Sequence, residues 1–572
     1  MPRGLVASAL HGVYTNPTFY APLTNSLVLT RGVGNPTFTR SDTADYCATI
    51  TDFEGLIKYV KSGEIRFNGA RRVENLLSGT ASLNSGSNKT ITVVAGQYVF
   101  SMGKGASSGV ATFSGTGGAT GTLTQNASSR TATKFTLTAG TFIVTASVVT
   151  LVDLQLELIS GQANQNPSEY VSGGILSSPY HGANVDGVKY FNYLNGNTLT
   201  NNVLTEAVGT AISDAILKGY LCEGNKVNLF KYSEQFNNGY WQTASNITIT
   251  PDSVISPAGT LTADKFTELA TTATHRVSAN NNNGETIVSG TIYTLSCYFK
   301  KGTRQFHALL VTDYAGSHQI RQWFDLDNGI LGTNSKLGTL IERNNATITD
   351  YGRGWYRATL TVTPTNTFSN IINLFITLAS ADGTSSYLGS ITQYGYFWGA
   401  KLEAGEFASS YNPTVAGAVT RGLGLNRNTV SSNISNTIFT GYAEYTPTAA
   451  TTSYIWGSYV DASNYTLLLY IAGSFIFRKR IAGTNYDATI AVTQTVGTKY
   501  KIAWRLSPIM GMDIFVNGTK GTVNANTTAM QLGAYFYIGN DGNGVESAWG
   551  YLKNYRNHKV AKTDTYLQAI TT

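Results

Sequence analysis

Four aromatic and polar residues near the C-terminal end of the chain are of the types that bind sugars: Tyr459, Asp461, Asn464 and Tyr465. A pyranose has an apolar face that stacks on aromatic rings and a rim of hydroxyl groups that pairs with carboxylate and amide groups. We expect these residues to lie in a loop. The segment therefore predicts a saccharide contact.

Tyr240 and Trp241 form a second candidate of the same kind. Two interpretations stay open for this pair, because tryptophan side chains more often pack in a core than contact a ligand. Stacking of nucleic-acid bases on these rings is not expected, since Lys and Arg residues are not interleaved with them. We therefore expect no nucleic-acid partner.

Catalytic chemistry finds little support in the residue pattern. Glycoside hydrolysis needs two carboxylates facing one cleft, roughly 5–9.5 Å apart. Asp325 and Asp327 share a strand face, but Asp327-Asn328-Gly329 forms a turn signal in which Asp325 caps the local backbone. Glu403 is expected to pair with a nearby base or with backbone amides. We expect no catalytic residue and no enzyme activity.

Metal and cofactor chemistry is equally sparse. The six histidines lack the close spacing of a zinc site, and no phosphate-binding Gly-Lys-Ser/Thr loop is present. The segment Asp541-Gly542-Asn543-Gly544 carries oxygen ligands suited to calcium, but it is short and has no acidic residue at a twelfth position. A plain turn is the main interpretation, and calcium on Asp541 and Asn543 is the alternative; no other metal and no cofactor are expected.

Charge is low throughout the chain. Only 13% of the 572 residues are charged, and 40 basic against 33 acidic residues give a net charge of +7. One basic cluster has two interpretations, a solvated linker or a docking surface for an acidic partner. Its members are Lys58, Lys61, Arg66, Arg71 and Arg72.

The three cysteines and the first residues bear on the compartment. Cys47, Cys222 and Cys297 are odd in number and far apart, which favours buried, reduced thiols over disulfides. The apolar run before His11 is too short for a signal peptide, and no stretch is long and apolar enough for a membrane span. We expect a chain made in a cytoplasm, without membrane insertion.

The elements that must position these residues are strands. Thr, Ser, Asn, Gly and Tyr dominate the polar positions, and short alternating segments recur between turn signals. The pattern predicts an all-β protein of tandem β-sandwich (jelly-roll) domains joined by extended connectors. Five regions are expected: an N-terminal region 1–76, a first β module 77–174, a connector 175–226, a second β module 227–417 and a last sandwich 418–572.

The two β modules repeat an opening and a closing motif. Val73-Glu74-Asn75-Leu76-Leu77 parallels Lys226-Val227-Asn228-Leu229-Phe230, and Leu154-Gln155-Leu156-Glu157 parallels Ala400-Lys401-Leu402-Glu403. One module used twice is therefore predicted.

One helix is expected, in the connector at about 203–218. Apolar residues recur there at helical spacing from Val203 to Ile216, Asn202 can cap the start, and Gly219 can close the end.

The second module resembles the carbohydrate-binding-module-like jelly rolls of bacteriophage tail and fibre proteins. The resemblance rests on Asn228-Leu229-Phe230 with Trp241, on Tyr293 to Gly302, on Trp323 to Gly329, and on Trp398 to Gly405. The segment Phe38 to Ala44 looks like one that precedes such modules in phage proteins. The first module keeps the opening and closing motifs but lacks tryptophan.

The last domain is similar to the concanavalin-A-like and laminin-G-like sandwiches. The match runs through Phe439 to Tyr445, Met512 to Gly518, Phe536 to Asn540 and Trp549 to Arg556. The resemblance implies a fold in which some members bind glycans or proteins, although a fold alone does not confer a ligand.

Together the resemblances imply a bacteriophage virion protein, made in the bacterial cytoplasm and most simply a tail-fibre or tail-tip adhesin. Its N-terminal region would attach to other virion proteins, its partner would be a host cell-surface glycan, and fibres of this kind are commonly homotrimers. Two alternatives stay open: a purely structural capsid decoration or baseplate protein, and a polysaccharide depolymerase.

Overall fold

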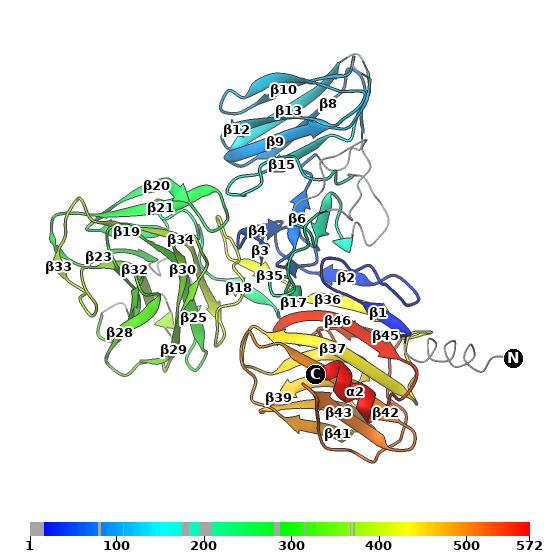
Figure 1. Cartoon of the computed structure of the whole chain (residues 1–572). Helices are drawn as coiled ribbons and strands as arrows, with labels where there is room; N and C mark the ends of the chain where they lie inside the picture. Colours follow the sequence, from blue (N-terminus) through cyan, green and yellow to red (C-terminus); the bar gives the residue numbers. More distant parts are fainter. Residues whose placement is uncertain are drawn as a thin grey trace.

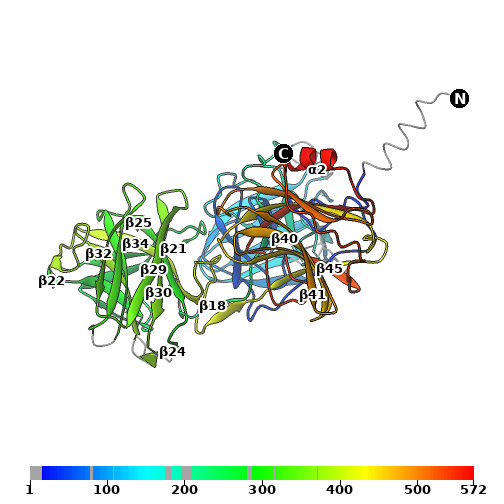
Figure 2. The ribbon, with the colours of Figure 1, turned by 90° about the horizontal axis from the view of Figure 1, so that it is seen from below.

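The computed structural model describes residues 16–77, 82–106, 108–147, 149–173, 182–194, 209–279, 286–313, 316–366, 368–369 and 372–572. The fold is all-β, as the sequence predicted, and its sheets are antiparallel. Figure 1 shows three lobes around a central junction. In the view of Figure 2 the second lobe stands to one side of the other two.

The first lobe is a small sandwich with a phenylalanine core. Phe142, Val144 and Ala146 alternate inward along one strand, and Phe142 packs against Phe100 and Phe113. One sheet has the order β11-β10-β13-β8 and the other β12-β9-β15, beside the short pair β7–β14. The strands are β7 Ser82–Leu83, β8 Asn88–Val93, β9 Gly96–Met102, β10 Val110–Gly115, β11 Thr120–Thr124, β12 Thr131–Leu137, β13 Gly140–Ser147, β14 Leu151–Val152 and β15 Gln155–Leu158.

The second lobe is a larger sandwich of two six-stranded sheets. The first sheet runs β19 Trp241–Ser245, β23 His275–Ala279, β32 Ile372–Ala379, β26 Phe306–Asp313, β27 Gln319–Asp325, β28 Ile330–Leu337. The second runs β20 Ile247–Ile255, β21 Leu261–Glu268, β34 Tyr394–Ala404, β25 Tyr293–Lys301, β30 Trp355–Pro364, β29 Ile341–Asp350. Two short pairs join β22 Thr272–Ala273 to β33 Tyr387–Leu388 and β24 Thr286–Ile287 to β31 Phe368–Ser369.

The third lobe is a sandwich to which distant parts of the chain contribute strands. One sheet runs β44 Thr519–Lys520, β43 Gly511–Val516, β42 Tyr500–Ser507, β37 Phe439–Pro447, β46 Gly550–His558, β17 Gly219–Cys222, β5 Phe67–Asn68, with β1 Phe19–Ala21 also on β46. The other runs β2 Thr37–Arg40, β36 Gly424–Thr429, β45 Tyr535–Ile538, β38 Ser453–Asp461, β39 Asn464–Ile471, β40 Ser474–Ile481, β41 Thr484–Ala491.

Strands β1, β2 and β5 of the N-terminal region therefore belong to sheets of the third lobe, and the region is not the separate segment that the sequence predicted. Phe19 is fully buried, with its ring 5.2 Å from Phe536 and 5.7 Å from Tyr555. Phe38 on β2 is buried beside Tyr220 of the connector. Strand pairing across more than 350 residues leaves no local mark in a sequence, which explains the difference.

The helix predicted at 203–218 is not found where the structure can test it. Residues 203–208 lie outside the described residues, whereas Ala211 forms a β-bridge with Tyr193 and residues 213–217 form a turn. The described α-helix is α2, Asp564–Thr571, whose Thr563 side chain caps its first turn. Within the described part of the chain, no helix is long and apolar enough to cross a membrane.

Three strand pairs form the junction between the lobes: β3 Ala48–Thr51 with β4 Ile57–Val60, β6 Arg71–Glu74 with β16 Val188–Phe191, and β18 Lys226–Asn228 with β35 Val419–Arg421. The basic cluster lies here, and neither of its interpretations describes its arginines, because they are paired inside the protein. Arg66 bonds Glu223 at 2.7 Å, Arg71 bonds Glu169 at 2.6 Å and Arg72 bonds Glu64 at 2.7 Å.

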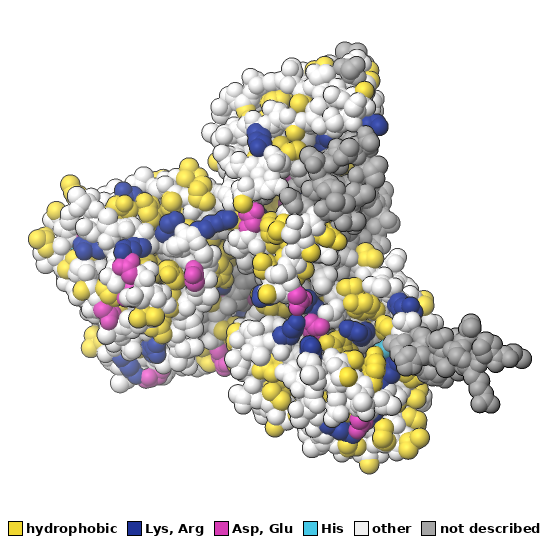
Figure 3. Space-filling view, in the orientation of Figure 1, with side chains coloured by type: hydrophobic (Ala, Val, Ile, Leu, Met, Phe, Trp, Pro, Cys, Tyr) yellow, Lys and Arg dark blue, Asp and Glu magenta, His cyan; other side chains and the backbone are white. Residues whose placement is uncertain are grey.

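The face drawn in Figure 3 is mainly uncharged, with few Lys, Arg, Asp and Glu side chains. Cys47, Cys222 and Cys297 are buried free thiols, as expected.

Candidate functional site

The predicted saccharide-binding residues lie together on the β38–β39 hairpin of the third lobe. Tyr459 on β38 stands directly opposite Tyr465 on β39. Their rings are stacked, with centroids 6.1 Å apart and planes 10° from parallel. Both side chains are half-buried and Asp461 at the turn is exposed. The structure thus joins the two tyrosines into one aromatic surface.

Hydrogen bonds fix the turn of this hairpin. The Asp461 carboxylate accepts bonds from the Ser463 N–H at 2.7 Å and from Asn464 Nδ2 at 3.0 Å. Asn464 Oδ1 in turn accepts the Ala482 N–H at 3.1 Å, which ties the hairpin to the neighbouring β40–β41 turn. The ring pair is therefore held by a rigid scaffold and not by a free loop.

The tyrosine surface continues across the outer face of the same sheet. The guanidinium group of Arg480 lies 5.7 Å from the Tyr465 ring, and Arg478 makes a 2.7 Å ion pair with Asp487. Tyr454 and Tyr465 cover a small apolar cluster formed by Leu467, Leu469 and Ile476. An aromatic pair edged by charged and amide groups can take the apolar face of a sugar and bond its hydroxyl groups.

The second predicted aromatic site is not available to a ligand. Trp241 is 3% exposed and Tyr240 is 8% exposed, and both pack in the core of the second lobe. The Trp241 indole donates a 2.9 Å hydrogen bond to the Tyr232 carbonyl, which satisfies its polar group internally. Core packing, the alternative interpretation, describes this pair.

The calcium candidate has the geometry of a turn. Asp541 Oδ1 accepts backbone N–H bonds from Asn543 at 3.0 Å and from Gly544 at 2.9 Å. Among the described residues, no three His, Cys, Asp or Glu side chains gather closely enough to hold a metal ion.

The carboxylates considered for catalysis serve the backbone and neighbouring side chains. Asp325 accepts bonds from the Asp327 and Asn328 N–H groups, as a turn cap does. Glu403 is fully buried, pairs with Lys401 at 2.9 Å and accepts the Ser409 N–H at 2.8 Å. The predicted structural role of Glu403 is what the contacts show.

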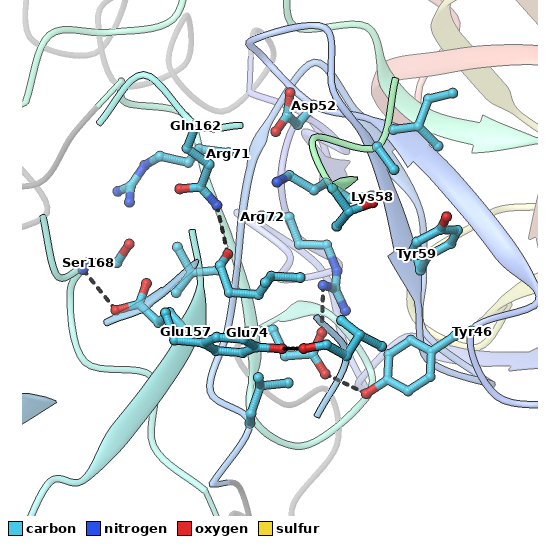
Figure 4. A pocket seen from close by; sticks show the side chains of 18 of the residues that line it. Tyr46, Asp52, Lys58, Tyr59, Arg71, Arg72, Glu74, Glu157, Gln162 and Ser168 are labelled. Carbon is cyan, nitrogen blue, oxygen red and sulfur yellow. Dashed lines mark hydrogen bonds and ion pairs between the residues drawn. The ribbon is translucent and has the colours of Figure 1, made fainter. Parts of the chain in front are cut away.

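A cleft of about 300 Å³ at the junction was missed by the sequence analysis. Its walls come from β4, β6 and the segments flanking β3 at the junction, from strands and turns of the first lobe, and from Ala258 and Thr260 of the second lobe. Figure 4 shows Asp52 and Lys58 at one end and Glu74 and Glu157 at the other. No single stretch of sequence contains this set, so no local pattern could have revealed it.

Burial changes the acid–base properties of the cleft. It raises the pKa of Asp52, partly offset by the nearby Lys58 ammonium and by backbone N–H bonds. Burial likewise raises the pKa of Glu157 and lowers that of Lys58. Glu74 differs, because Arg72 and Lys61 outweigh its burial and lower its pKa.

No protein-family model and no curated protein matches the chain. Among solved structures, the SAP-like pentraxin of Limulus polyphemus is similar over 24% of this chain and 70% of that one, with 16% identity and a TM-score of 0.21. Domain 4 of an extracellular arabinanase from Geobacillus stearothermophilus covers 29% of this chain and 84% of its own, with 15% identity and a TM-score of 0.24. Domains LG4–5 of the mouse laminin α1 chain cover 49% and 86%, with 12% identity and a TM-score of 0.20. At these values the similarities assign the chain to no family.

Proposed function

We propose that this protein is a non-enzymatic saccharide-binding adhesin of a bacteriophage particle, carried at the tail fibre or tail tip. The observation that carries the proposal is the stacked Tyr459–Tyr465 pair on the outer face of the third lobe. Asp461 and Asn464 at the same hairpin supply hydrogen-bonding groups beside the rings. This pairing of an apolar surface with a polar rim matches the two sides of a sugar.

Adhesion through such a site depends on repetition. One shallow aromatic contact binds weakly, and several copies on one particle gain avidity because the second binding event is intramolecular. We propose a homotrimer made in the bacterial cytoplasm and attached to other virion proteins through its N-terminal region. That region contributes β1, β2 and β5 to the third lobe, so the proposed attachment region and the proposed saccharide site share one folded unit.

The structural alternative, a capsid decoration or baseplate protein without a receptor, is supported by the ion pairs that fix the junction. Negative-stain imaging of particles labelled with an antibody to residues 418–572 distinguishes the two. Label at the distal tail supports adhesion, and label over the head supports decoration.

The depolymerase alternative would need the carboxylates of the junction cleft. Asp52 caps its own turn through the Glu54 and Leu56 N–H groups, and Glu74 bonds Arg72 and Tyr46. Shortening of host polysaccharide by the purified protein would favour this alternative over adhesion.

The direct test is a glycan array probed with the full chain and two variants. Tyr465→Ala removes one ring of the pair and should abolish saccharide capture, since stacking supplies most of the contact. Tyr566→Ala on α2, which packs on the opposite sheet of the same lobe, is the matched control and should bind normally. Equal binding by both variants would exclude the hairpin as the site.

A further inference from the structure

We propose that the junction cleft is a second binding site, for an uncharged, hydroxyl-rich ligand of one or two sugar rings that is held chiefly by Lys58 and Asp52. This site lies apart from the tyrosine hairpin and does not depend on it. The ligand class follows from the unused polar atoms, the charge balance and the aromatic walls of the cleft.

Lys58 is the residue of the cleft that points most directly to a ligand. Its side chain is half-buried, yet within the described residues its ammonium group makes no hydrogen bond and no direct ion pair. Asp52 and Glu54 act on it only at longer range. Lys58 lines a cleft of about 300 Å³, and its three N–H donors are an unfilled requirement there, because a partly desolvated ammonium needs acceptors.

Hydrogen-bond acceptors line the same space. Asp52 Oδ1 accepts two backbone N–H bonds, and no described donor bonds Oδ2. Gln162 donates through Nε2 to the Leu158 carbonyl at 3.1 Å, and no described donor bonds its Oε1. A hydroxyl group both donates and accepts, so it satisfies an ammonium and a carboxylate or amide at once.

The charge balance excludes a strongly charged ligand. Arg71 is paired with Glu169, and Arg72 is paired with Glu64 and Glu74. Glu54 pairs with Arg353, and the buried Glu157 accepts bonds from Gln155 and the Ser168 N–H, while Lys58 and Asp52 compensate each other. An anion or a cation entering the cleft would bring a charge without a partner, and a buried unpaired charge is costly.

Aromatic side chains supply part of the remaining walls. The hydroxyl of Tyr46 donates to Glu74 at 2.7 Å, that of Tyr59 to Glu234 at 2.8 Å, and that of Tyr98 to the Val94 carbonyl at 2.7 Å. Their polar ends are thus already satisfied, and what they offer the cleft is ring surface. The volume, about 300 Å³, lies at the small end of the range for small-molecule sites.

The test uses saturation-transfer NMR on the full chain with four probes: lactose, maltose, cellobiose and the anionic analogue sialyllactose. Lys58→Met keeps the apolar stem and removes the donors, and should weaken neutral-disaccharide binding by roughly tenfold. Val94→Trp places a large ring at the mouth from a side chain that is 57% exposed, and should abolish binding without disturbing the fold. Lys134→Met, on the exposed side of β12, is the matched control and should bind like the wild type.

The outcomes separate this site from the tyrosine hairpin. Signals that weaken in Lys58→Met and disappear in Val94→Trp, but persist in Tyr465→Ala, establish the cleft. Signals lost only in Tyr465→Ala leave the hairpin site standing and overturn the cleft proposal. Binding of none of the three neutral disaccharides, or stronger binding of sialyllactose than of lactose, also overturns it.

Discussion

Asn228 makes in the second lobe the same four side-chain hydrogen bonds that Asn75 makes in the first. Asn75 Nδ2 donates to the Leu154 and Val171 carbonyls at 2.9 and 3.0 Å, and Oδ1 accepts the Leu77 and Leu156 N–H groups at 3.0 and 3.3 Å. Asn228 Nδ2 donates to the Ala400 and Asn412 carbonyls at 3.2 and 2.8 Å, and Oδ1 accepts the Phe230 and Leu402 N–H groups, both at 3.2 Å. Each asparagine therefore clips the opening motif of its module to the closing one.

Replacing Asn228 by Ala should destabilise the second lobe by about 2–4 kcal/mol, because fully buried backbone groups lose their partners. Asn75→Ala should destabilise the first lobe similarly. Hydrogen exchange followed by mass spectrometry localises each effect to its lobe. Asn334→Ala, at an exposed position of β28, is the control and should change stability by less than about 0.5 kcal/mol. If Asn75→Ala and Asn228→Ala change stability no more than the control does, these asparagines do not hold the two motifs together.

Phe19 should contribute as much to the stability of the third lobe as a core residue from 418–572. Removing its fully buried ring by Phe19→Ala should cost about 3–5 kcal/mol and lower the melting temperature of the third lobe. Phe536→Ala, its packing partner on β45, should cost a similar amount, whereas Val28→Ala, 56% exposed, should cost little. Differential scanning calorimetry of the three variants decides the point. An unchanged third-lobe transition in Phe19→Ala would contradict the placement of β1 in the third lobe.

Glu223 joins the second lobe to the junction. It pairs with Arg66 at 2.7 Å and with Arg421 at 3.1 Å, and it accepts the Ser410 N–H at 2.8 Å. Burial alone would raise the pKa of Glu223, but the Arg421 and Arg66 guanidinium groups and the bonds from Ser410 hold it well below the ordinary value. Glu223→Gln leaves two buried cations without their anion, so we expect a loss of about 3–5 kcal/mol at pH 7.

This loss should depend on pH in a defined direction. The folded pKa lies below the unfolded value of about 4.3, so the stabilisation is present above that value and is lost as the pH falls through the folded pKa. The wild-type advantage over Glu223→Gln in urea unfolding should therefore shrink below about pH 4. Glu406→Gln, at an exposed position nearby, is the control, and the wild type should show no such advantage over it.

The sequence predicted the parts of this fold that repeat or alternate locally. The two modules were recognisable because Asn75 and Asn228 sit in matching motifs, and the Tyr459–Tyr465 pair because its residues adjoin one hairpin turn. Tyr240 and Trp241 are aromatic too, but Phe230 and Phe236 pack on Trp241, and Tyr240 packs on Trp241 in the same core. Composition alone does not distinguish a buried ring from an exposed one.

The parts that could not be predicted depend on distant contacts. Phe19 reaches Phe536 across most of the chain, and the cleft gathers Lys58, Glu157 and Ala258 from separate regions. The basic cluster looked solvated because its acidic partners Glu169 and Glu223 are remote in sequence.

Lys401 and Gln155 occupy equivalent places in the two modules and provide the last test. Lys401 Nζ contacts Glu403 at 2.9 Å and the Ser410 carbonyl at 2.9 Å, while Gln155 Nε2 bonds Glu157 at 2.8 Å and the Glu169 carbonyl at 3.2 Å. Lys401→Gln therefore places the residue of the first module in the second, and we expect the lobe to fold.

The wild type and Lys401→Gln should differ in how their free energy of unfolding changes with pH. Burial, opposed by Glu403, lowers the pKa of Lys401 to about 7, against about 10.4 in an unfolded chain. Between these values the unfolded state binds the extra proton, so wild-type stability should rise by about 2 kcal/mol from pH 7 to pH 9 relative to Lys401→Gln. Urea unfolding of both proteins, followed by tryptophan fluorescence, measures this difference, in which the shared titration of buried tyrosines and thiols cancels. A difference that stays constant over this range would mean that Lys401 remains charged in the folded protein.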